Sequence, residues 1–201
     1  MSGENRLEML GISKNFGGVR ALKKIDFKLK PGSIHALVGE NGAGKSTLIR
    51  ILAGVINANE GEIYVDGELQ DITNPSIARN LGISVIYQEY ALASDLTVAE
   101  NIYMDTLREN SGNKKLINWN TLNSNAHKLL ESLGFGHINE KSKVLDLSIA
   151  YQQVVEICKA LSRKTSILVL DEPTALLATH EVKQLFKLLL KLRDEGVGII
   201  Y

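Results

Sequence analysis

Short apolar runs alternate with amphipathic stretches along the 201 residues. Runs with the length and composition of strands occupy residues 7–10, 22–29, 35–38, 63–65, 83–87, 167–170 and 197–201. Asp66-Gly67, placed just before Leu69, is a strong signal for a two-residue hairpin turn. The first third of the chain is therefore predicted to contain antiparallel strands, and residues 167–170 are predicted to form a buried strand.

The segment after Lys45 is predicted to be an amphipathic helix that ends at Gly54. Its expected buried face consists of Leu48, Ile51, Leu52 and Val55. From about Asp95 the helical pattern dominates, because Thr97 and Glu100 have the spacing of a capping box.

Three further helices are predicted in the second half of the chain. One covers residues 122–133, and the other two begin at Ser148 and Thr179, which are expected to cap them. Gly134 and Gly196 are placed to end the first and the last of these helices. The order of strands and helices predicts an α/β fold with an added helical region.

Composition narrows the function classes. The formal net charge is zero and no long basic run is present, which argues against a nucleic-acid partner. Cys158 is the only cysteine, so the chain has no internal disulfide and is compatible with the cytosol. The four histidines lack metal-ligand spacing, and no apolar run approaches the roughly 20 residues that span a bilayer. A membrane role is therefore expected only through a partner.

Residues 39–47 read GENGAGKST and lie between a predicted strand and a predicted helix. Glycines at three positions let backbone N–H groups approach phosphate oxygens, and a helix N-terminus favours anions. In such a loop Lys45 reaches the β and γ phosphates and Ser46 ligates Mg²⁺. The residues expected to bind ATP here are Gly39, Glu40, Asn41, Gly42, Ala43, Gly44, Lys45, Ser46 and Thr47.

A pair of adjacent carboxylates follows the apolar run at residues 167–170. Ligands of doubly wound sheets bind where the strands end, which is where Asp171 and Glu172 stand. Asp171 is expected to hold Mg²⁺, and Glu172 is expected to act on the water that attacks the γ phosphate. Gln88, after another apolar run, is a candidate for contacting the metal or that water.

These residues, in this order, resemble the ATP-binding cassette ATPases. The resemblance rests on Phe16, where the family has an adenine-stacking aromatic, on the loop at 39–47, on Gln88, and on LSIAYQQ and ILVLDEPT at residues 147–153 and 167–174. It implies a P-loop NTPase core with a parallel sheet and an antiparallel β subdomain, formed by residues 1–92 and 164–201, and a helical subdomain at 93–163. It also implies Mg²⁺-dependent hydrolysis of ATP.

The segment at residues 147–151 departs from the family signature Leu-Ser-Gly-Gly-Gln. In the family this segment meets the γ phosphate of ATP held by an opposing cassette, a role that Ser148 retains. Ile149 and Ala150 replace the two glycines and place Cβ atoms where backbone approaches phosphate, and Tyr151 replaces the glutamine. A second departure follows the acidic pair, where residues 175–178 read ALLA and lack the usual polar contacts.

Three segments resemble the first cassette of tandem chains that energise bacterial import of monosaccharides such as ribose, galactose and xylose. They are Tyr-Gln-Glu at residues 87–89, LSIAYQQVVEICKALS at 147–162 and DEPTALLATHEV at 171–182. That resemblance implies four features: a second cassette, a membrane permease, a sugar-binding protein reached indirectly, and a location on the cytoplasmic face of the membrane. The family's switch histidine lies beyond a strand like that at residues 197–201, so an incomplete cassette with little hydrolysis of its own is expected.

Three other classes stay open on the sequence. A soluble cassette protein acting on ribosomes or DNA usually carries a long insertion, and none lies between Gln88 and Leu147. A small P-loop kinase would need a phosphate-acceptor site and a basic lid, against which the DEPT segment and the helix at Ser148 argue. A shortened nucleotide-binding module without turnover is the third.

Overall fold

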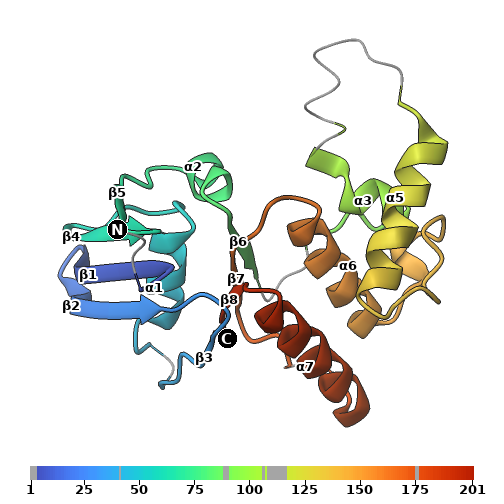
Figure 1. Ribbon diagram of the computed structural model, residues 1–201. Helices are drawn as coiled ribbons and strands as arrows, with labels where there is room; N and C mark the ends of the chain where they lie inside the picture. The colour runs from blue at the N-terminus through green and yellow to red at the C-terminus, as the bar shows by residue number, and fades with distance from the viewer. Residues whose placement is uncertain (1–3, 41, 88–90, 106, 108–116, 175–176) are drawn as a thin grey trace. The chain divides into compact units, whose positions relative to one another are not determined.

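Two sheets share one hydrophobic core in the first of two compact units. The computed structural model describes residues 4–40, 42–87, 91–105, 107, 117–174 and 177–201 (Figure 1). The first unit consists of Met1–Val85, Thr165–Asp171 and Leu192–Tyr201, and the second of Ile86–Lys164 and Glu172–Lys191. The domain limits predicted from the sequence stay a prediction.

The antiparallel sheet of the first unit has the order β2-β1-β4-β5. Its strands are β1 (Leu7–Phe16), β2 (Val19–Leu29), β4 (Glu60–Val65) and β5 (Glu68–Gln70). Asp66 and Gly67 join β4 to β5 with φ angles of 52° and 81°, the left-handed pair that a type I′ turn requires. The predicted hairpin is therefore confirmed.

The second sheet has the order β3-β8-β7-β6, with β8 parallel to both of its neighbours. Its strands are β3 (Ile34–His35), β6 (Ile83–Ile86), β7 (Ile167–Leu170) and β8 (Gly198–Ile200). All four residues of β7 are buried, as the apolar run predicts. The prediction for residues 35–38 was too long: the Leu37 N–H still bonds the Tyr201 carbonyl at 2.7 Å, but Val38 is 89% exposed.

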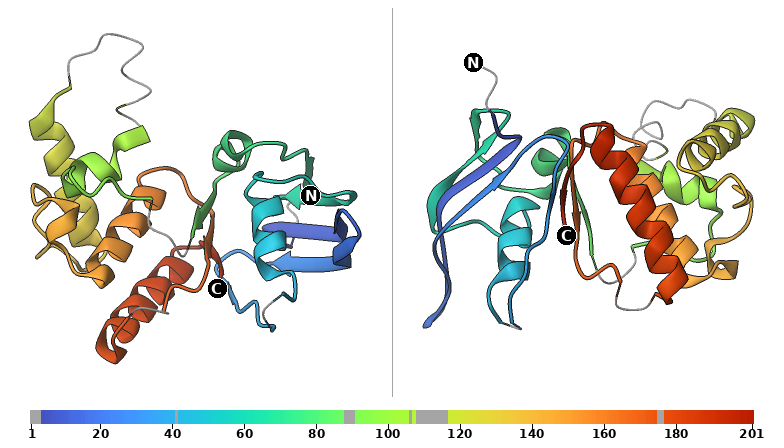
Figure 2. Two further views of the ribbon diagram at one scale, coloured as in Figure 1. Left: turned by 180° about the vertical axis from the view of Figure 1, so that it is seen from behind. Right: turned by 60° about the horizontal axis from the view of Figure 1, so that its bottom comes forward.

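Helix α1 (Lys45–Leu52) lies between the two sheets, and its Leu48, Ile49, Ile51 and Leu52 are buried in the core that both sheets share (Figure 2). The prediction that Val55 joins this face was wrong. The helix stops at Leu52, Gly54 turns the chain with a φ of 68°, and Val55 is left 51% exposed.

A short helix, α2 (Pro75–Asn80), was missed in the sequence. Its signal was Asn74-Pro75, because the Asn74 side chain accepts hydrogen bonds from the N–H groups of Ser76 and Ile77 while proline suits the first helical position. The helix is too short for its apolar spacing to be visible.

The second unit is helical. Its elements are α3 (Val98–Ile102), α5 (Trp119–Ser132), a 3-10 turn at Val144–Asp146, α6 (Ile149–Leu161) and most of α7 (Thr179–Asp194). The capping box of Thr97 and Glu100 is present, with both of its hydrogen bonds. Within the described residues, no helix has the length and apolar character needed to cross a membrane.

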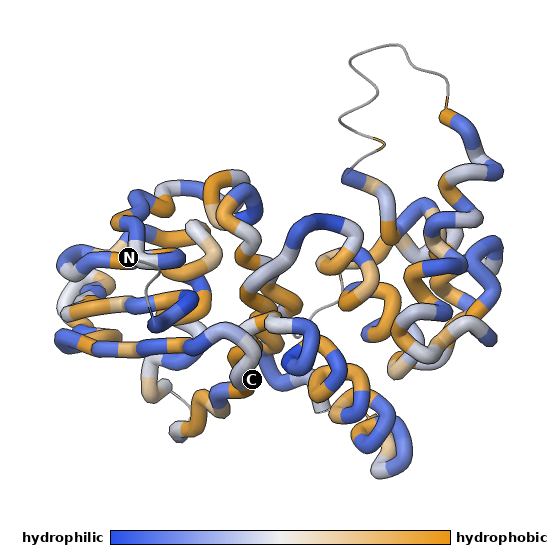
Figure 3. Tube along the Cα trace, viewed as in Figure 1, coloured by the Kyte–Doolittle hydropathy of each residue, from blue (hydrophilic) through white to orange (hydrophobic). Residues whose placement is uncertain are grey.

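Helix α7 is amphipathic along its length, as the orange and blue positions in Figure 3 show. The prediction that Thr179 caps it was wrong by one residue. Thr179 is the first helical residue, and the Glu181 carboxylate reaches back to accept from the N–H of Ala178 at 2.8 Å. Ala178 therefore occupies the capping position, with Glu181 supplying one half of a capping box.

Candidate nucleotide-binding site

The loop between β3 and α1 presents backbone N–H groups at a helix N-terminus. Gly44 is the N-cap of α1 in the left-handed conformation, with φ 92° and ψ 2°, and no side chain caps the helix. The first helical bond is donated by the N–H of Leu48 to the Gly44 carbonyl, at 2.9 Å. The N–H groups of the first turn, together with the helix dipole, therefore favour an anion here.

Packing explains why glycine stands at position 44. A Cβ there would lie 2.6 Å from Leu22 Cδ2 and 2.7 Å from the Ala21 carbonyl oxygen, both on β2. Any larger residue would push the loop away from the antiparallel sheet, in addition to the strain of a positive φ. Gly42 has a φ of 86° but nothing within 4 Å of its ideal Cβ, so conformation alone favours glycine there.

The Lys45 side chain folds back over this loop. Its ammonium group donates to the carbonyl oxygens of Gly39 at 2.5 Å and Glu40 at 3.0 Å. These neutral acceptors hold the ammonium group beside the loop, and anionic phosphate oxygens would make stronger bonds to it. The structure therefore keeps the predicted phosphate-binding cation at the predicted loop.

Two oxygen ligands fit a magnesium ion. Ser46 is exposed in the first turn of α1, and no bond to its hydroxyl is seen among the described residues. Asp171 is half-buried and directly follows β7, at the same edge of the parallel sheet as the loop after β3. One strand, β8, separates β3 from β7, so the two strand ends are about 10 Å apart.

This donor set matches the preferences of magnesium. Mg²⁺ takes one or two protein oxygens and fills its other positions with water and substrate phosphates. Within the described residues, no cluster of three or more histidine, cysteine, aspartate or glutamate ligands exists. The residues present therefore fit a magnesium ion bound together with a nucleotide.

Phe16 ends β1 and is 48% exposed, so its ring is accessible to a base. The Lys14 ammonium group lies 5.3 Å from the ring centroid, which places a cation over the same aromatic face. Phe16 and the loop belong to the same unit. The predicted role of Phe16 in stacking adenine stays a prediction.

Glu172 follows Asp171 in a left-handed conformation with a φ of 51°, and its side chain is exposed. A non-glycine residue there costs about 1–2 kcal/mol, and such strain clusters at functional positions. Glu172 starts a segment of the second unit, so its role as a base stays a prediction. Asn41 and Gln88 lie outside the described residues.

Ser148 is the N-cap of α6, and its hydroxyl accepts from the N–H of Tyr151 at 3.4 Å. Tyr151, one of the departures from the family signature, turns back onto its own unit. Its hydroxyl lies 3.1 Å from His137 Nε2, and the two rings meet edge to face at 5.3 Å. Tyr151 is thus held by the loop after α5.

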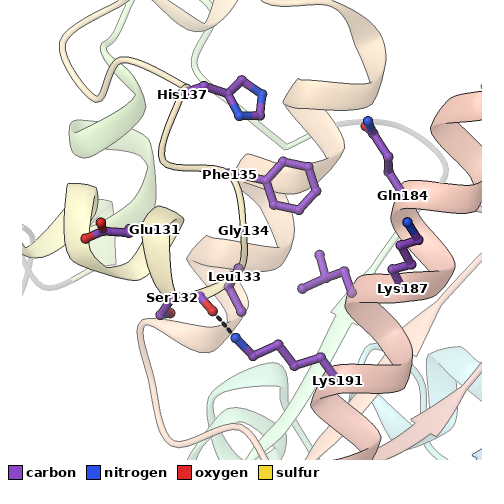
Figure 4. Close-up of a pocket in the computed structure, with 10 residues that line it drawn as sticks. Glu131, Ser132, Leu133, Gly134, Phe135, His137, Gln184, Lys187 and Lys191 are labelled. Carbon is purple, nitrogen blue, oxygen red and sulfur yellow. Dashed lines mark hydrogen bonds between the residues drawn. The ribbon is translucent and has the colours of Figure 1, made fainter.

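A cavity of about 440 Å³ lies in the second unit between the loop after α5 and α7 (Figure 4). Its lining includes Phe135, His137, Lys187 and Lys191, and none of the predicted site residues. Lys191 spans the opening by donating to the Ser132 carbonyl. The cavity has neither a glycine-rich loop nor a helix N-terminus, so it does not suit a triphosphate.

Two buried groups on α6 have perturbed acidities. Burial raises the pKa of the Cys158 thiol to about 12, which makes the only cysteine unreactive at neutral pH. Burial also raises the pKa of Glu156, partly offset by Lys159 and the backbone at Ala91. Glu156 was not singled out in the sequence, where it looks like part of an ordinary amphipathic helix.

Comparison with known proteins decides the family. The family model described as "ABC transporter" matches residues 22–175, from β2 past the acidic pair. The chain belongs to this family. The predicted resemblance is therefore confirmed.

Curated relatives of this ABC cassette include ribose import ATP-binding proteins. The protein of that name from Rubrobacter xylanophilus is 47% identical over 195 residues, which are 97% of this chain and 38% of the relative. The one from Rhizobium meliloti is 48% identical over 190 residues, or 94% of this chain and 36% of the relative. The chain thus spans less than two fifths of the length of these relatives.

Solved structures of ABC cassettes have the same fold. An ATP-binding cassette of an ABC transporter in its ADP conformation superposes with a TM-score of 0.86 and 27% identity, covering 98% of this chain and 80% of that one. A CbiO protein from Clostridium perfringens, part of an ABC transporter complex, gives a TM-score of 0.82 at 27% identity, with 98% and 77% coverage. The predicted α/β fold of a P-loop NTPase is confirmed.

Proposed function

We propose that the chain is an ATP-binding half of a monosaccharide importer, in which Mg²⁺-dependent hydrolysis of ATP drives a membrane permease. The observation that carries this is the loop at residues 39–47, which offers a free helix N-terminus, with Lys45 bonded to its carbonyls. Ribose is the sugar to test first, since curated relatives are named for its import.

In this proposal the first unit binds the triphosphate. Backbone N–H groups around Gly42 and Gly44 and the Lys45 ammonium group receive the phosphates, while Phe16 stacks on adenine. Ser46, Asp171 and Gln88 would hold Mg²⁺, which neutralises charge on the phosphate oxygens. Most of the catalysis is positioning and charge stabilisation, because phosphoryl transfer needs little covalent chemistry from the protein.

Glu172 is proposed to orient the attacking water and accept its proton. Ser148 is proposed to serve the nucleotide of an opposing cassette, with its hydroxyl and the helix dipole of α6 directed at the γ phosphate. A second cassette, a permease and a sugar-binding protein complete the proposed assembly, which works at the cytoplasmic face of the membrane. The length of the relatives supports a second cassette. This chain matches only 38% of one relative, and the rest of that relative is long enough for another cassette.

Nucleotide binding by the chain itself tests the core of this proposal. Isothermal titration with Mg-ATP is expected to give saturable binding that Lys45→Ala weakens about 100-fold, since one charged partner of the phosphates is lost. Lys183→Ala removes an exposed lysine from α7 and serves as the control. Equal affinities for the two variants, or no binding by the unchanged chain, would refute the assignment.

A further inference from the structure

The backbone that follows Gln88 is fastened by a buried side chain of α3. Asn101 is fully buried, and its amide group bonds both polar groups of one residue's backbone. The Ala93 N–H donates to Asn101 Oδ1 at 2.8 Å, and Asn101 Nδ2 donates to the Ala93 carbonyl at 3.0 Å. The Asn101 side chain thus satisfies the N–H and the carbonyl of Ala93, as a neighbouring strand does for an extended backbone.

Helix α6 fastens the same segment two residues earlier. Lys159 Nζ donates to the Ala91 carbonyl at 2.9 Å. The donor is charged, and charge-assisted hydrogen bonds are the stronger ones. Lys159 thus ties the carbonyl of Ala91 to the last turns of α6.

The segment is attached to the other end of α6 as well. The N–H of Leu145 donates to the Ser94 carbonyl and that of Val144 to the Leu96 carbonyl, both at 3.0 Å. Gln152, in the first turns of α6, donates to the Leu147 carbonyl at 3.1 Å. The chain from Ala91 to Leu96 is therefore tied to both ends of the helix that begins after Ser148.

We propose that Lys159 is a positioning residue that transmits movement of the segment at residues 91–96 to Ser148. Ala91 lies three residues after Gln88, and α6 has 13 residues, a rigid rod of about 20 Å. A displacement of the segment moves the whole helix, because both of its ends are tied to that segment. The inference rests on the proposed function, in which the cassette drives a permease and Ser148 serves ATP.

The tie also works in the opposite direction. Coupling between two sites is reciprocal. ATP that binds at Ser148 is therefore expected to displace the segment at Ala91 through helix α6. Loss of Lys159 leaves the Ala91 carbonyl without its charged donor and lets the segment move independently of α6.

The test measures coupling in the complete importer, reconstituted with its permease in liposomes. ATP hydrolysis is recorded without and with ribose-loaded binding protein. Lys159→Met is expected to lower the ratio of stimulated to basal hydrolysis about fivefold or more, with basal hydrolysis and the affinity for Mg-ATP within about twofold of the unchanged protein. Lys159→Arg keeps a charged donor and is expected to restore most of the ratio.

Lys164→Met is the matched control, because Lys164 is an exposed lysine just beyond α6. Amide hydrogen exchange of residues 91–97 in the chain itself gives a second measurement, with about tenfold faster exchange expected in Lys159→Met and none in the control. An unchanged ratio with unchanged exchange would overturn the inference, and so would equal losses in Lys159→Met and Lys159→Arg.

The two proposals fail in different ways. If the unchanged importer does not hydrolyse ATP or respond to ribose, the proposed function fails, and the exchange measurement still decides whether Lys159 ties the segment to α6. If the unchanged importer is stimulated and Lys159→Met is stimulated equally, only the positioning role fails.

Discussion

The N-termini of α1 and α6 each present a helix dipole, and they differ in what surrounds it. Helix α1 starts after a left-handed Gly44 with no side-chain cap, so its first N–H groups are open. Helix α6 starts after an extended Ser148, whose hydroxyl already accepts from Tyr151. The first end suits direct backbone contact with phosphate, and the second keeps a hydroxyl and a dipole only.

The side chains in the first turn of α6 make its N-terminus differ further from that of α1. Ile149 is 43% exposed at the start of α6, and Tyr151 is engaged with His137. Where the family signature has two glycines and a glutamine, this helix has two apolar residues and a packed tyrosine. A helix N-terminus therefore suits a phosphate well or poorly, depending on the atoms that lie between the helix dipole and the ligand.

The largest effect is expected from a substitution that stops ATP hydrolysis and leaves ATP binding at the N-terminus of α1 intact. Glu172→Gln should cut ATP hydrolysis by the complete protein about 100-fold or more, because a general base is lost, while ATP affinity is retained. Steady-state phosphate release, measured with the second cassette inactivated, checks this. Glu181→Gln is the control on the same acidic segment, and unchanged hydrolysis in Glu172→Gln would remove this residue from the mechanism.

The second largest effect is expected from a substitution that distorts the N-terminus of α1 alone. Gly44→Ala places a Cβ against Leu22 and the Ala21 carbonyl at a φ of 92°, so unfolding should become easier by about 2–3 kcal/mol and ATP affinity should fall at least tenfold. Gly42→Ala meets only the conformational cost, about 1–2 kcal/mol. Urea unfolding and ATP titration compare the two, and equal losses would contradict the packing argument.

A smaller effect is expected from making the α6 end resemble the α1 end. The double change Ile149→Gly and Ala150→Gly restores backbone access at a cost of about 1–2 kcal/mol in helix stability. We expect hydrolysis by the complete protein to rise about threefold, because the nucleotide of the opposing cassette gains backbone contacts. Ala160→Gly, near the end of the same helix, controls for stability, and a matching change in hydrolysis there would argue against the access explanation.

The smallest effect concerns Glu156, whose pKa is raised by burial. A carboxyl group with a raised folded-state pKa contributes stability that is fully present below its unfolded pKa and is lost as the pH rises through the folded value. Glu156→Gln cannot ionise, so it should flatten this loss and stabilise the second unit at neutral pH by about 1 kcal/mol.

Thermal unfolding between pH 4 and 8 measures that effect. Glu131→Gln, an exposed carboxyl group on α5, is the control. If Glu156→Gln lowers the melting temperature at every pH, ion pairing with Lys159 outweighs burial and the sign of the prediction is wrong.

Much of the fold was readable because local signals agreed with one another. The Asp66-Gly67 turn, the Thr97 capping box and the buried strand at residues 167–170 each combine a pattern with a specific end signal. Errors occurred where a single residue was judged by spacing alone. Val55 has helical spacing after Leu52, yet Gly54 had already turned the chain away from the core.

The phosphate loop was predictable for a physical reason as well. Its function depends on backbone N–H groups and one lysine close together in the chain, so all of its requirements appear within residues 39–47. The ties at Ala91 and Ala93 had no such signal. Asn101 and Lys159 look like ordinary helix residues until the fold brings them to this backbone.

By itself, then, the sequence determined what local chemistry can specify: the glycine-rich loop, the acidic pair after a buried strand, the Asp66-Gly67 turn and the Thr97 capping box. The tertiary structure decided the contacts between residues that are far apart in the sequence. It placed Leu22 so that only glycine fits at position 44, inserted β8 between β3 and β7, and brought α6 against the backbone of Ala91. Turns and caps are set by neighbouring residues, whereas strand order and buried ties depend on the packing of the whole unit.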